Sequence, residues 1–595
     1  MRVWSARITS ISIVLVITAC GVQQVSDSDD GAKDATQPEP TDAAIQQVAS
    51  PSAVAPAGAP AGAPAHIEDT VLQAEQAIVS REAPNRGKGE SFAEQSHALV
   101  RLTSRLPRGY PQPAYNAAEN YQTYAENSIK RAAEEPLSTF SIDVDTGAYS
   151  NMRRYLNLGQ MPPVDAVRVE ELINYFSYDY PIPQSTETPF SIYTEMAPSP
   201  WNKGKHLLHI GLQGFELPRN SMPASNLVFL IDVSGSMQAP NKLELVKSSL
   251  KLLTKQLSRE DSIAIVTYAG SAGTVLEPVK GSDKAEIYAA LDRLRAHGST
   301  WGEGGIMAAY RLARTAFIDN GINRVVLATD GDFNVGIADV AELKKRIKRE
   351  RESGIGLTTL GFGMGNYNDA MLEQLADVGN GNYAYIDNLN EARKVLVEEI
   401  SSTLNTIASD VKIQIEFNPA IVSEYRLIGY ENRLLKREDF NNDKVDAGEI
   451  GAGHSVTALY EIALKNSGSA TIDPLRYQKD VPRSDRQNDA EIAFLKLRYK
   501  TPGETTSRLV TQTLLQEDIQ PSMDNSSSDF KFAAAVSGFG QLLRASEYLT
   551  ECNHASVIAL AKAGQGPDRN GYRGEFIKLV ELADALVLPI AQVSE

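Results

Sequence analysis

The sequence predicts a multidomain α/β plus β protein, in which a doubly wound, mostly parallel sheet is inserted between β-rich flanking segments and a helical region closes the chain. Three observations carry this expectation. Apolar strands alternate with amphipathic helices between residues 226 and 404. Strands of alternating polarity precede and follow that stretch. Helical spacing takes over from residue 530, and such changes of period mark changes of layer architecture.

Composition excludes several classes of protein. The chain has 595 residues, of which 42% are hydrophobic and 22% charged, values of a folded protein rather than a disordered chain, a polytopic membrane protein or a collagen-like fibre. A formal charge of −17 disfavours nucleic acid, whose phosphates need Lys and Arg. Cys20 and Cys552 are its two cysteines, so neither a disulfide framework nor a cysteine zinc site fits within one chain.

The first residues predict an export signal. Two arginines precede a short apolar run at residues 8–17, too short to span a membrane. Small residues then lead into Cys20, and this segment resembles a bacterial lipobox. The resemblance implies a lipoprotein signal peptide over residues 1–19 and a lipid, such as palmitate, on Cys20. Gly21 in the next position implies sorting to the outer membrane. An ordinary secretory signal with an incidental cysteine is the alternative.

Residues 20–109 are expected to form a disordered Ala/Pro-rich tether. Residues 21–90 contain no aromatic side chain and cannot bury enough apolar area to fold. An N-terminal α+β region follows at 110–223, with alternating strands at 190–196 and 206–215. Within it, Asp143 and Asp145 fail the spacing of a calcium loop and are interpreted as a polar strand end.

Residues 224–404 predict the α/β domain, because continuous apolar strands separated by helices indicate a parallel sheet covered on both faces. Ligands of such sheets bind at the carboxyl ends of the strands. Residues 405–595 predict a β-rich and then helical domain. Neither flanking set of strands is long enough for a sandwich alone. We therefore expect the strands before and after the α/β domain to pair with each other in one β-sandwich.

Polar motifs follow several strands of the predicted α/β domain. Asp232-Val-Ser234-Gly-Ser236 ends the first apolar strand, and Asp330 ends another. Thr300 lies in a short polar segment that leads into a helix. The three segments should converge on one edge of the sheet.

This assembly resembles the von Willebrand factor type A domain and its metal-ion-dependent adhesion site. The resemblance implies that Ser234 and Ser236 coordinate a divalent ion directly. It implies that Thr300 binds the ion directly or through water, and that Asp232 and Asp330 act mainly through water. Hard oxygen ligands suit Mg²⁺, with Mn²⁺ or Ca²⁺ as other occupants. The alternative is that the same residues cap helices and form turns.

The wider chain resembles bacterial YfbK-type von Willebrand lipoproteins, through the segments around residues 140–155 and 168–180, the central domain and the C-terminal stretch. The expected function is that of a membrane-anchored cell-envelope binding protein, which captures a protein partner through a metal bridge to an Asp or Glu of that partner. A structural or assembly scaffold, with a metal site that only stabilises, is the alternative. The residues expected to flank the site, and so to contact a partner or pack a loop, are Trp301, Glu303, Asp332 and Phe333.

Other sequence features favour no further chemistry. The seven histidines form no HExxH motif, so no enzyme activity is expected. Gly361-Phe-Gly363-Met-Gly365 lacks the full dinucleotide fingerprint, and no nucleotide is expected. The cationic run at residues 344–351 is interpreted as a solvated helix face.

Overall fold

The computed structural model describes residues 119–183, 187–218, 221–300, 302–331, 340–477 and 490–587. All of these belong to one compact unit, Leu102–Glu595. The predicted signal peptide, Cys20 and the whole of the predicted tether lie outside the described residues. Within the described ranges, no helix combines the length and the apolar character that a membrane span needs.

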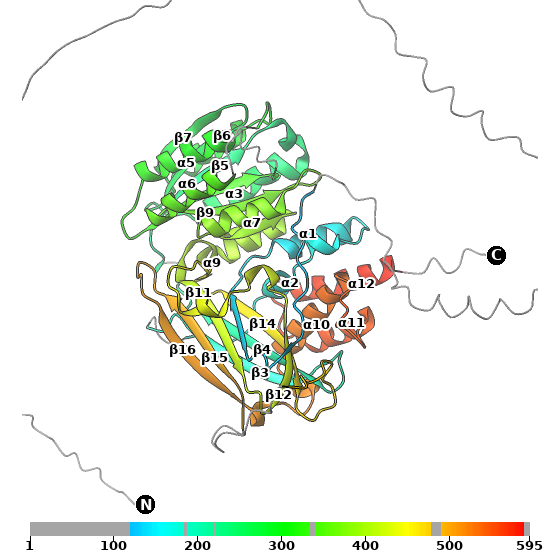
Figure 1. Cartoon of the computed structure of the whole chain (residues 1–595). Coiled ribbons are helices and arrows are strands. Elements are labelled where there is room, and N and C mark those ends of the chain that lie inside the picture. The colour runs from blue at the N-terminus through cyan, green and yellow to red at the C-terminus, as the bar shows by residue number, and fades with distance from the viewer. Residues whose placement is uncertain are drawn as a thin grey trace, which may run out of the picture. The chain divides into compact units, whose positions relative to one another are not determined.

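The central α/β domain, drawn in green in Figure 1, is built on one sheet. Its strand order is β10-β9-β8-β5-β6-β7. Its neighbouring strands run parallel, except that β7 pairs antiparallel with β6 at the edge. This confirms the predicted doubly wound, mostly parallel sheet. The strands are β5 (Ser225–Asp232), β6 (Ser262–Tyr268), β7 (Ala272–Lys280), β8 (Ile322–Thr329), β9 (Gly356–Phe362) and β10 (Tyr383–Ile386).

Helices cover both faces of this sheet, and the central strand β5 shows why. Its side chains alternate between the faces. Leu227, Phe229 and Ile231 join the buried cluster of α3, α4 and α8, whereas Val228 and Leu230 join that of α5, α6 and α7. The helices are α3 (Leu245–Gln256), α4 (Lys284–Arg293), α5 (Gly302–Thr315), α6 (Val340–Glu352), α7 (Asp369–Val378), α8 (Leu389–Arg393) and α9 (Ile400–Leu404).

The flanking strands form the two sheets of a β-sandwich, one ordered β1-β12-β14-β4-β3 and the other β13-β11-β15-β16, with β2 also on the edge of β11. Because β4 pairs with β14 and β2 pairs with β11, the predicted pairing of strands across the inserted α/β domain is confirmed. The strands are β1 (Lys130–Arg131), β2 (Leu137–Ser141), β3 (Phe190–Pro198), β4 (Lys205–Gly214), β11 (Thr406–Phe417), β12 (Val422–Ile428), β13 (Gly448–Gly451), β14 (Ser455–Leu464), β15 (Glu491–Lys500) and β16 (Arg508–Leu515).

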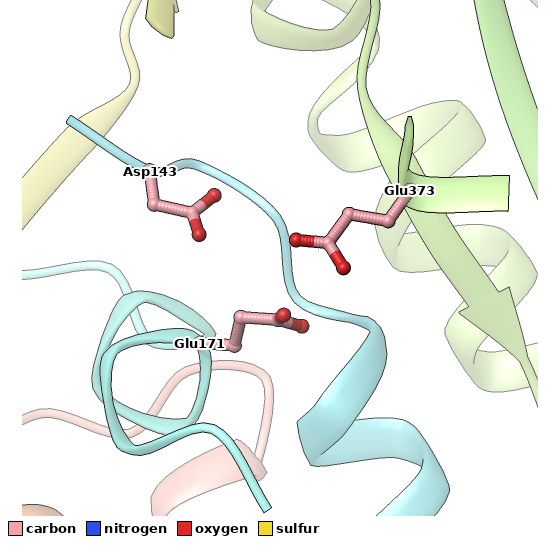
Figure 2. Close-up of side chains that lie close together, drawn as sticks. All are labelled: Asp143, Glu171 and Glu373. Carbon is pink, nitrogen blue, oxygen red and sulfur yellow. The ribbon is translucent and has the colours of Figure 1, made fainter. Parts of the chain in front are cut away.

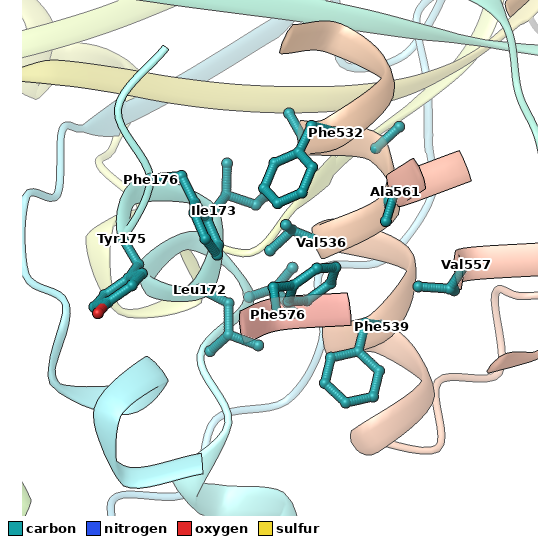
Figure 3. Packing of buried hydrophobic residues seen from close by; sticks show 14 of the residues in the cluster. Leu172, Ile173, Tyr175, Phe176, Phe532, Val536, Phe539, Val557, Ala561 and Phe576 are labelled. Atoms are coloured by element: carbon teal, nitrogen blue, oxygen red, sulfur yellow. The ribbon is translucent and has the colours of Figure 1, made fainter. Parts of the chain in front are cut away.

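A helical layer packs on the sandwich, and its core joins the segment of α2 to the C-terminal helices (Figure 3). The helices α1 (Gly147–Asn157) and α2 (Val169–Asn174) contribute from the N-terminal side. The C-terminal side supplies α10 (Ser528–Leu543), α11 (His554–Ala563) and α12 (Tyr572–Leu586). Phe176, which follows α2, packs edge to face against Phe532 of α10 and Phe576 of α12. The N-terminal region therefore completes the core of the C-terminal helices.

The structure differs from the sequence expectation mainly at edges and helix ends. The sequence pattern does not indicate the strands β1, β7, β13 and β16. β7 and β16 are largely exposed, and an edge strand lacks the apolar alternation that marks a half-buried one. The helical sequence pattern over residues 389–404 corresponds in the structure to α8, a π-helical turn at Lys394–Glu398 and α9.

Candidate functional site

The Asp-x-Ser-x-Ser motif lies where predicted, at the carboxyl end of β5. The backbone amide of Ser234 donates to Asp232 Oδ1 at 2.8 Å, and the Oγ atoms of Ser234 and Ser236 are 3.0 Å apart. Asp232 and Ser234 are buried, whereas Ser236 is half-buried. The loop thus orients two hydroxyls toward each other at the rim of the sheet.

Neutral donors hold the Asp232 carboxylate. Thr329 Oγ1 donates to Asp232 Oδ2 at 2.9 Å, and the Tyr268 hydroxyl donates to the same oxygen at 3.2 Å. Burial raises the pKa of Asp232 to about 6, although the hydrogen bonds from Ser234 and Thr329 oppose that rise. The carboxylate is therefore fixed in place without a paired cation among these contacts, and its negative charge remains available to a bound ion.

A second segment is brought to this loop by backbone hydrogen bonds. The His297 amide donates to Val233 O at 2.7 Å, and the Gly235 amide donates to Gly298 O at 2.9 Å. Thr300 follows two residues later, half-buried and just before α5. The structure therefore brings the segment of Thr300 beside the serine loop.

Asp330 follows β8 and is buried against a lysine that the sequence analysis did not single out. Lys242 Nζ lies 2.8 Å from Asp330 Oδ2 and 2.9 Å from Asn366 Oδ1. Asn366 Nδ2 also donates to Asp330 Oδ2, at 3.3 Å. No local sequence pattern indicates that the ammonium of Lys242 reaches Asp330.

The residues expected to flank the site are partly described. Glu303 lies on α5, and its carboxylate is 3.1 Å from Arg346 on α6. Trp301, Asp332 and Phe333 lie outside the described residues. The cationic run on α6 faces solvent in part and pairs with acids such as Glu342 and Asp446.

The donor set of this edge fits a divalent ion with hard ligands. Two ligands at right angles, each 2.0–2.1 Å from an ion, would be separated by about 2.9 Å. The 3.0 Å between the two serine hydroxyls matches that separation. The carboxylates of Asp232 and Asp330 approach the same edge, and their mutual repulsion contributes to the raised pKa of Asp232. Hydroxyl and carboxylate oxygens are the ligands that Mg²⁺ prefers.

The loop between β9 and α7 links this edge to the N-terminal segment. Glu119 accepts a hydrogen bond from the Gly365 amide at 2.8 Å, and Arg154 of α1 donates to both of its oxygens. The burial of Glu119 would raise its pKa, but hydrogen bonding and attraction by Arg154 lower the pKa to about 2. Because Asn366 follows Gly365 directly, Glu119 braces the loop that supplies a contact to Asp330.

A second charged cluster gathers around α7, and we call it the α7 network. Figure 2 shows three of its carboxylates, from Asp143, Glu171 and Glu373, which approach within 4.8 Å of one another. The guanidinium of Arg433 contacts Asp143 at 3.0 Å, and that of Arg168 contacts Glu373 at 3.2 Å. The network comprises Arg168 and Arg433 together with the carboxylates of Asp143, Asp145, Glu171, Asp369, Glu373 and Asp377.

Asp143 and Asp145 follow the end of β2, where the sequence interpretation placed a polar strand end. The structure adds that both residues are buried and paired with Arg433. Arginines already engage the three carboxylates of Figure 2, because Asp143 contacts Arg433 through both of its oxygens and Glu171 also contacts Arg168. The cluster therefore joins α7 to the N-terminal region and the sandwich, and we assign it no metal.

Three family matches cover most of the described chain. Residues 115–209 match the family described as von Willebrand factor, residues 226–399 the von Willebrand factor type A domain, and residues 402–586 the uncharacterized protein YfbK, C-terminal. Together with the doubly wound sheet, the second match defines a von Willebrand factor type A domain protein. Such domains commonly bind a divalent metal.

Comparison with whole proteins identifies the family. The chain is 50% identical over 472 residues to the uncharacterized protein YfbK of Escherichia coli (strain K12). The aligned residues cover 78% of this chain and 81% of that protein. The protein therefore belongs to the YfbK family. It is also 24% identical over 341 residues to the human inter-alpha-trypsin inhibitor heavy chain H3, covering 51% of this chain and 38% of that protein.

Two solved structures align with this chain at low TM-scores. A von Willebrand factor type A protein from Catenulispora acidiphila aligns with a TM-score of 0.38 and 14% identity, covering 68% of this chain and 91% of that one. The ArnB paralog VWA2 from Sulfolobus acidocaldarius aligns with a TM-score of 0.34 and 15% identity, covering 67% of this chain and 98% of that one.

Proposed function

We propose that this chain is a membrane-anchored binding protein of the cell envelope, which captures a protein partner through a divalent ion that bridges to an acidic residue of the partner. The observation that carries the proposal is the gathering of the Ser234 and Ser236 hydroxyls, the Thr300 segment and two buried carboxylates at one edge of the sheet. A bound ion would supply a positive charge that neutral hydroxyls compensate only in part, and it would therefore attract a carboxylate.

The chain's own residues would prepare that contact. Asp232 orients Ser234 through the backbone amide, while Thr329 and Tyr268 hold Asp232 in one position. Ser236 is partly exposed, so a partner can approach from its side of the loop. The proposal assigns no reaction to the chain, and it includes neither nucleic acid nor a nucleotide as partner.

Membrane attachment through a lipid on Cys20, and residence at the outer membrane, are part of the same proposal. They rest on the lipobox-like segment of the sequence. The Cys20→Ser substitution should move the protein from the membrane fraction to the soluble fraction. Fractionation of cells that express the variant would measure this. Unchanged membrane association of that variant would contradict the lipid anchor.

Calorimetric titration of the purified chain with Mg²⁺ and Mn²⁺ tests the metal site. We expect binding in the wild type and its loss in Asp232→Ala, since this substitution removes the group that orients Ser234. Ser248→Ala is the matched control, because Ser248 is an exposed serine on α3. Partner capture should depend on Mg²⁺ and be absent in Asp232→Ala. Capture that survives both the substitution and a chelator would contradict the proposal.

A scaffold function is the second candidate, and the ion pairs that join the α/β domain to its surroundings favour it. Arg153 of α1 contacts Glu391 of α8 at 2.7 Å and Glu575 of α12 at 3.1 Å. Ion pairs that fix the α/β domain to the helices around it are typical of a domain with a structural role. In that case Mg²⁺ should raise the melting temperature, while partner binding should persist without metal.

A further inference from the structure

The lysine that contacts Asp330 is buried and held by the local backbone and by two polar partners. Lys242 lies in a π-helical turn, Pro240–Glu244, before α3, where its backbone leaves helical geometry (φ −117°, ψ −108°). Its side chain is 7% exposed. The ammonium contacts both Asp330 and Asn366, so residues from three separate segments meet there.

A glycine makes room for the lysine side chain. Gly363 has φ +77°, and a Cβ at this position would lie 2.4 Å from Lys242 Cε. Residue 363 must therefore be glycine, or the lysine stem must move. The loop that carries Gly363 also carries Asn366, and Glu119 braces it at Gly365.

The lysine changes the charge that a divalent ion would meet. Asp232 and Asp330 are the acidic members of the predicted ion-binding set, and the serines and threonine are neutral. Lys242 offsets one of the two carboxylates from 2.8 Å away. An ion beside Asp330 would also be repelled by this buried ammonium, because like charges interact strongly where water is excluded.

We propose that Lys242 is a positioning residue that serves as a built-in counter-cation for Asp330. It holds the carboxylate in place and weakens the binding of a divalent ion, so that tight binding requires the additional carboxylate of an acidic partner. The inference rests on the proposed metal site and explains how that site would couple ion binding to partner binding.

Calorimetric Mg²⁺ titration of the full chain tests this role, with the wild type compared with Lys242→Met, Lys242→Gln and Lys242→Arg. Removal of one neighbouring positive charge should tighten Mg²⁺ binding by about tenfold in the Met and Gln variants. Lys242→Arg keeps the charge and should bind like the wild type. Lys247→Met is the matched control, since Lys247 is a buried lysine on α3 that pairs with Glu244. It should leave the affinity unchanged.

The direction of the change separates this role from simple structural damage, which would weaken ion binding. Melting curves without Mg²⁺ should show lower stability in Lys242→Met, because Asp330 loses its buried cation, and saturating Mg²⁺ should restore it. Equal or weaker affinity in both charge-removing variants would overturn the inference while leaving the metal site intact. No binding in the wild type or in any variant would overturn the metal site and the inference together.

Discussion

The sheet-edge site and the α7 network both bury carboxylates, but they satisfy them differently. At the edge, Asp232 receives hydrogen bonds from a backbone amide and two hydroxyls. In the α7 network, Asp143 and Asp145 contact the guanidinium of Arg433. Neutral donors fix a carboxylate and leave most of its charge uncompensated, whereas guanidinium partners neutralise it.

This difference indicates separate roles for the two regions. A site that must receive a cation needs negative charge that no internal cation fully cancels. A cluster that joins structural elements needs that charge cancelled inside the fold, because unpaired buried charges are costly. Lys242 gives the edge site an intermediate character, since it cancels one of the two carboxylates there.

Removal of the central arginine of the α7 network should have the largest effect on stability. Arg433→Met would leave Asp143, Asp145 and Asp377 without their shared cation. The expected loss in the free energy of unfolding is about 3–5 kcal/mol, as for other broken buried ion pairs. Urea denaturation followed by circular dichroism would measure it.

Arg508→Met is the control for that experiment, because Arg508 forms a half-exposed pair with Glu504 on the sandwich surface. Its effect should stay within about 0.5 kcal/mol. A loss below about 1 kcal/mol in Arg433→Met would mean that protonation, rather than Arg433, relieves the clustered acids.

A comparable but pH-dependent effect is expected at Glu170, beside the same network. Both of its carboxylate oxygens are buried, without a hydrogen-bond partner in the described part of the chain. Burial, with repulsion from Glu431 and Asp143, raises the pKa of Glu170 to about 8. The folded state therefore holds a proton that the unfolded state releases near pH 4.5, and stability should fall as the pH rises from about 5 to 8.

Glu170→Gln should remove this part of the pH dependence, because glutamine stays neutral. The variant should match the wild type near pH 4 and exceed it by roughly 3–5 kcal/mol at pH 9. Thermal melts across that pH range, with the exposed Glu504→Gln as control, would measure the difference. A wild type and variant with parallel pH profiles would show that Glu170 is not protonated in the folded state.

The convergence of polar residues at the sheet edge could be predicted from the sequence, whereas the α7 network could not, for a physical reason. The carboxyl ends of parallel strands must meet at one edge, so Asp232 and Asp330 could be placed together from their positions after apolar strands. Lys242 could not, because its contact with Asp330 depends on the turn before α3 and on the space left by Gly363.

One feature of the sequence does point to the α7 network. Asp369, Glu373 and Asp377 recur every four residues, which places them on one face of α7. Such a face requires cations from elsewhere in the fold or exposure to water. Arg168 and Arg433 supply them from the N-terminal region and the sandwich, and no local pattern in the sequence reveals those distant contacts.

The smallest effect on stability is expected within the edge site, where the effect on ion binding should be large. Ser234→Ala removes a hydroxyl whose described partner is the Ser236 hydroxyl at 3.0 Å, so it should cost about 1 kcal/mol or less. Urea denaturation of the metal-free protein would measure that cost, and calorimetry should show loss of Mg²⁺ binding in the same variant. Loss of several kcal/mol in metal-free Ser234→Ala would instead make the edge a structural cluster like the α7 network. A small loss of stability together with a loss of Mg²⁺ binding would show that the edge site serves ion binding, whereas the α7 network serves stability.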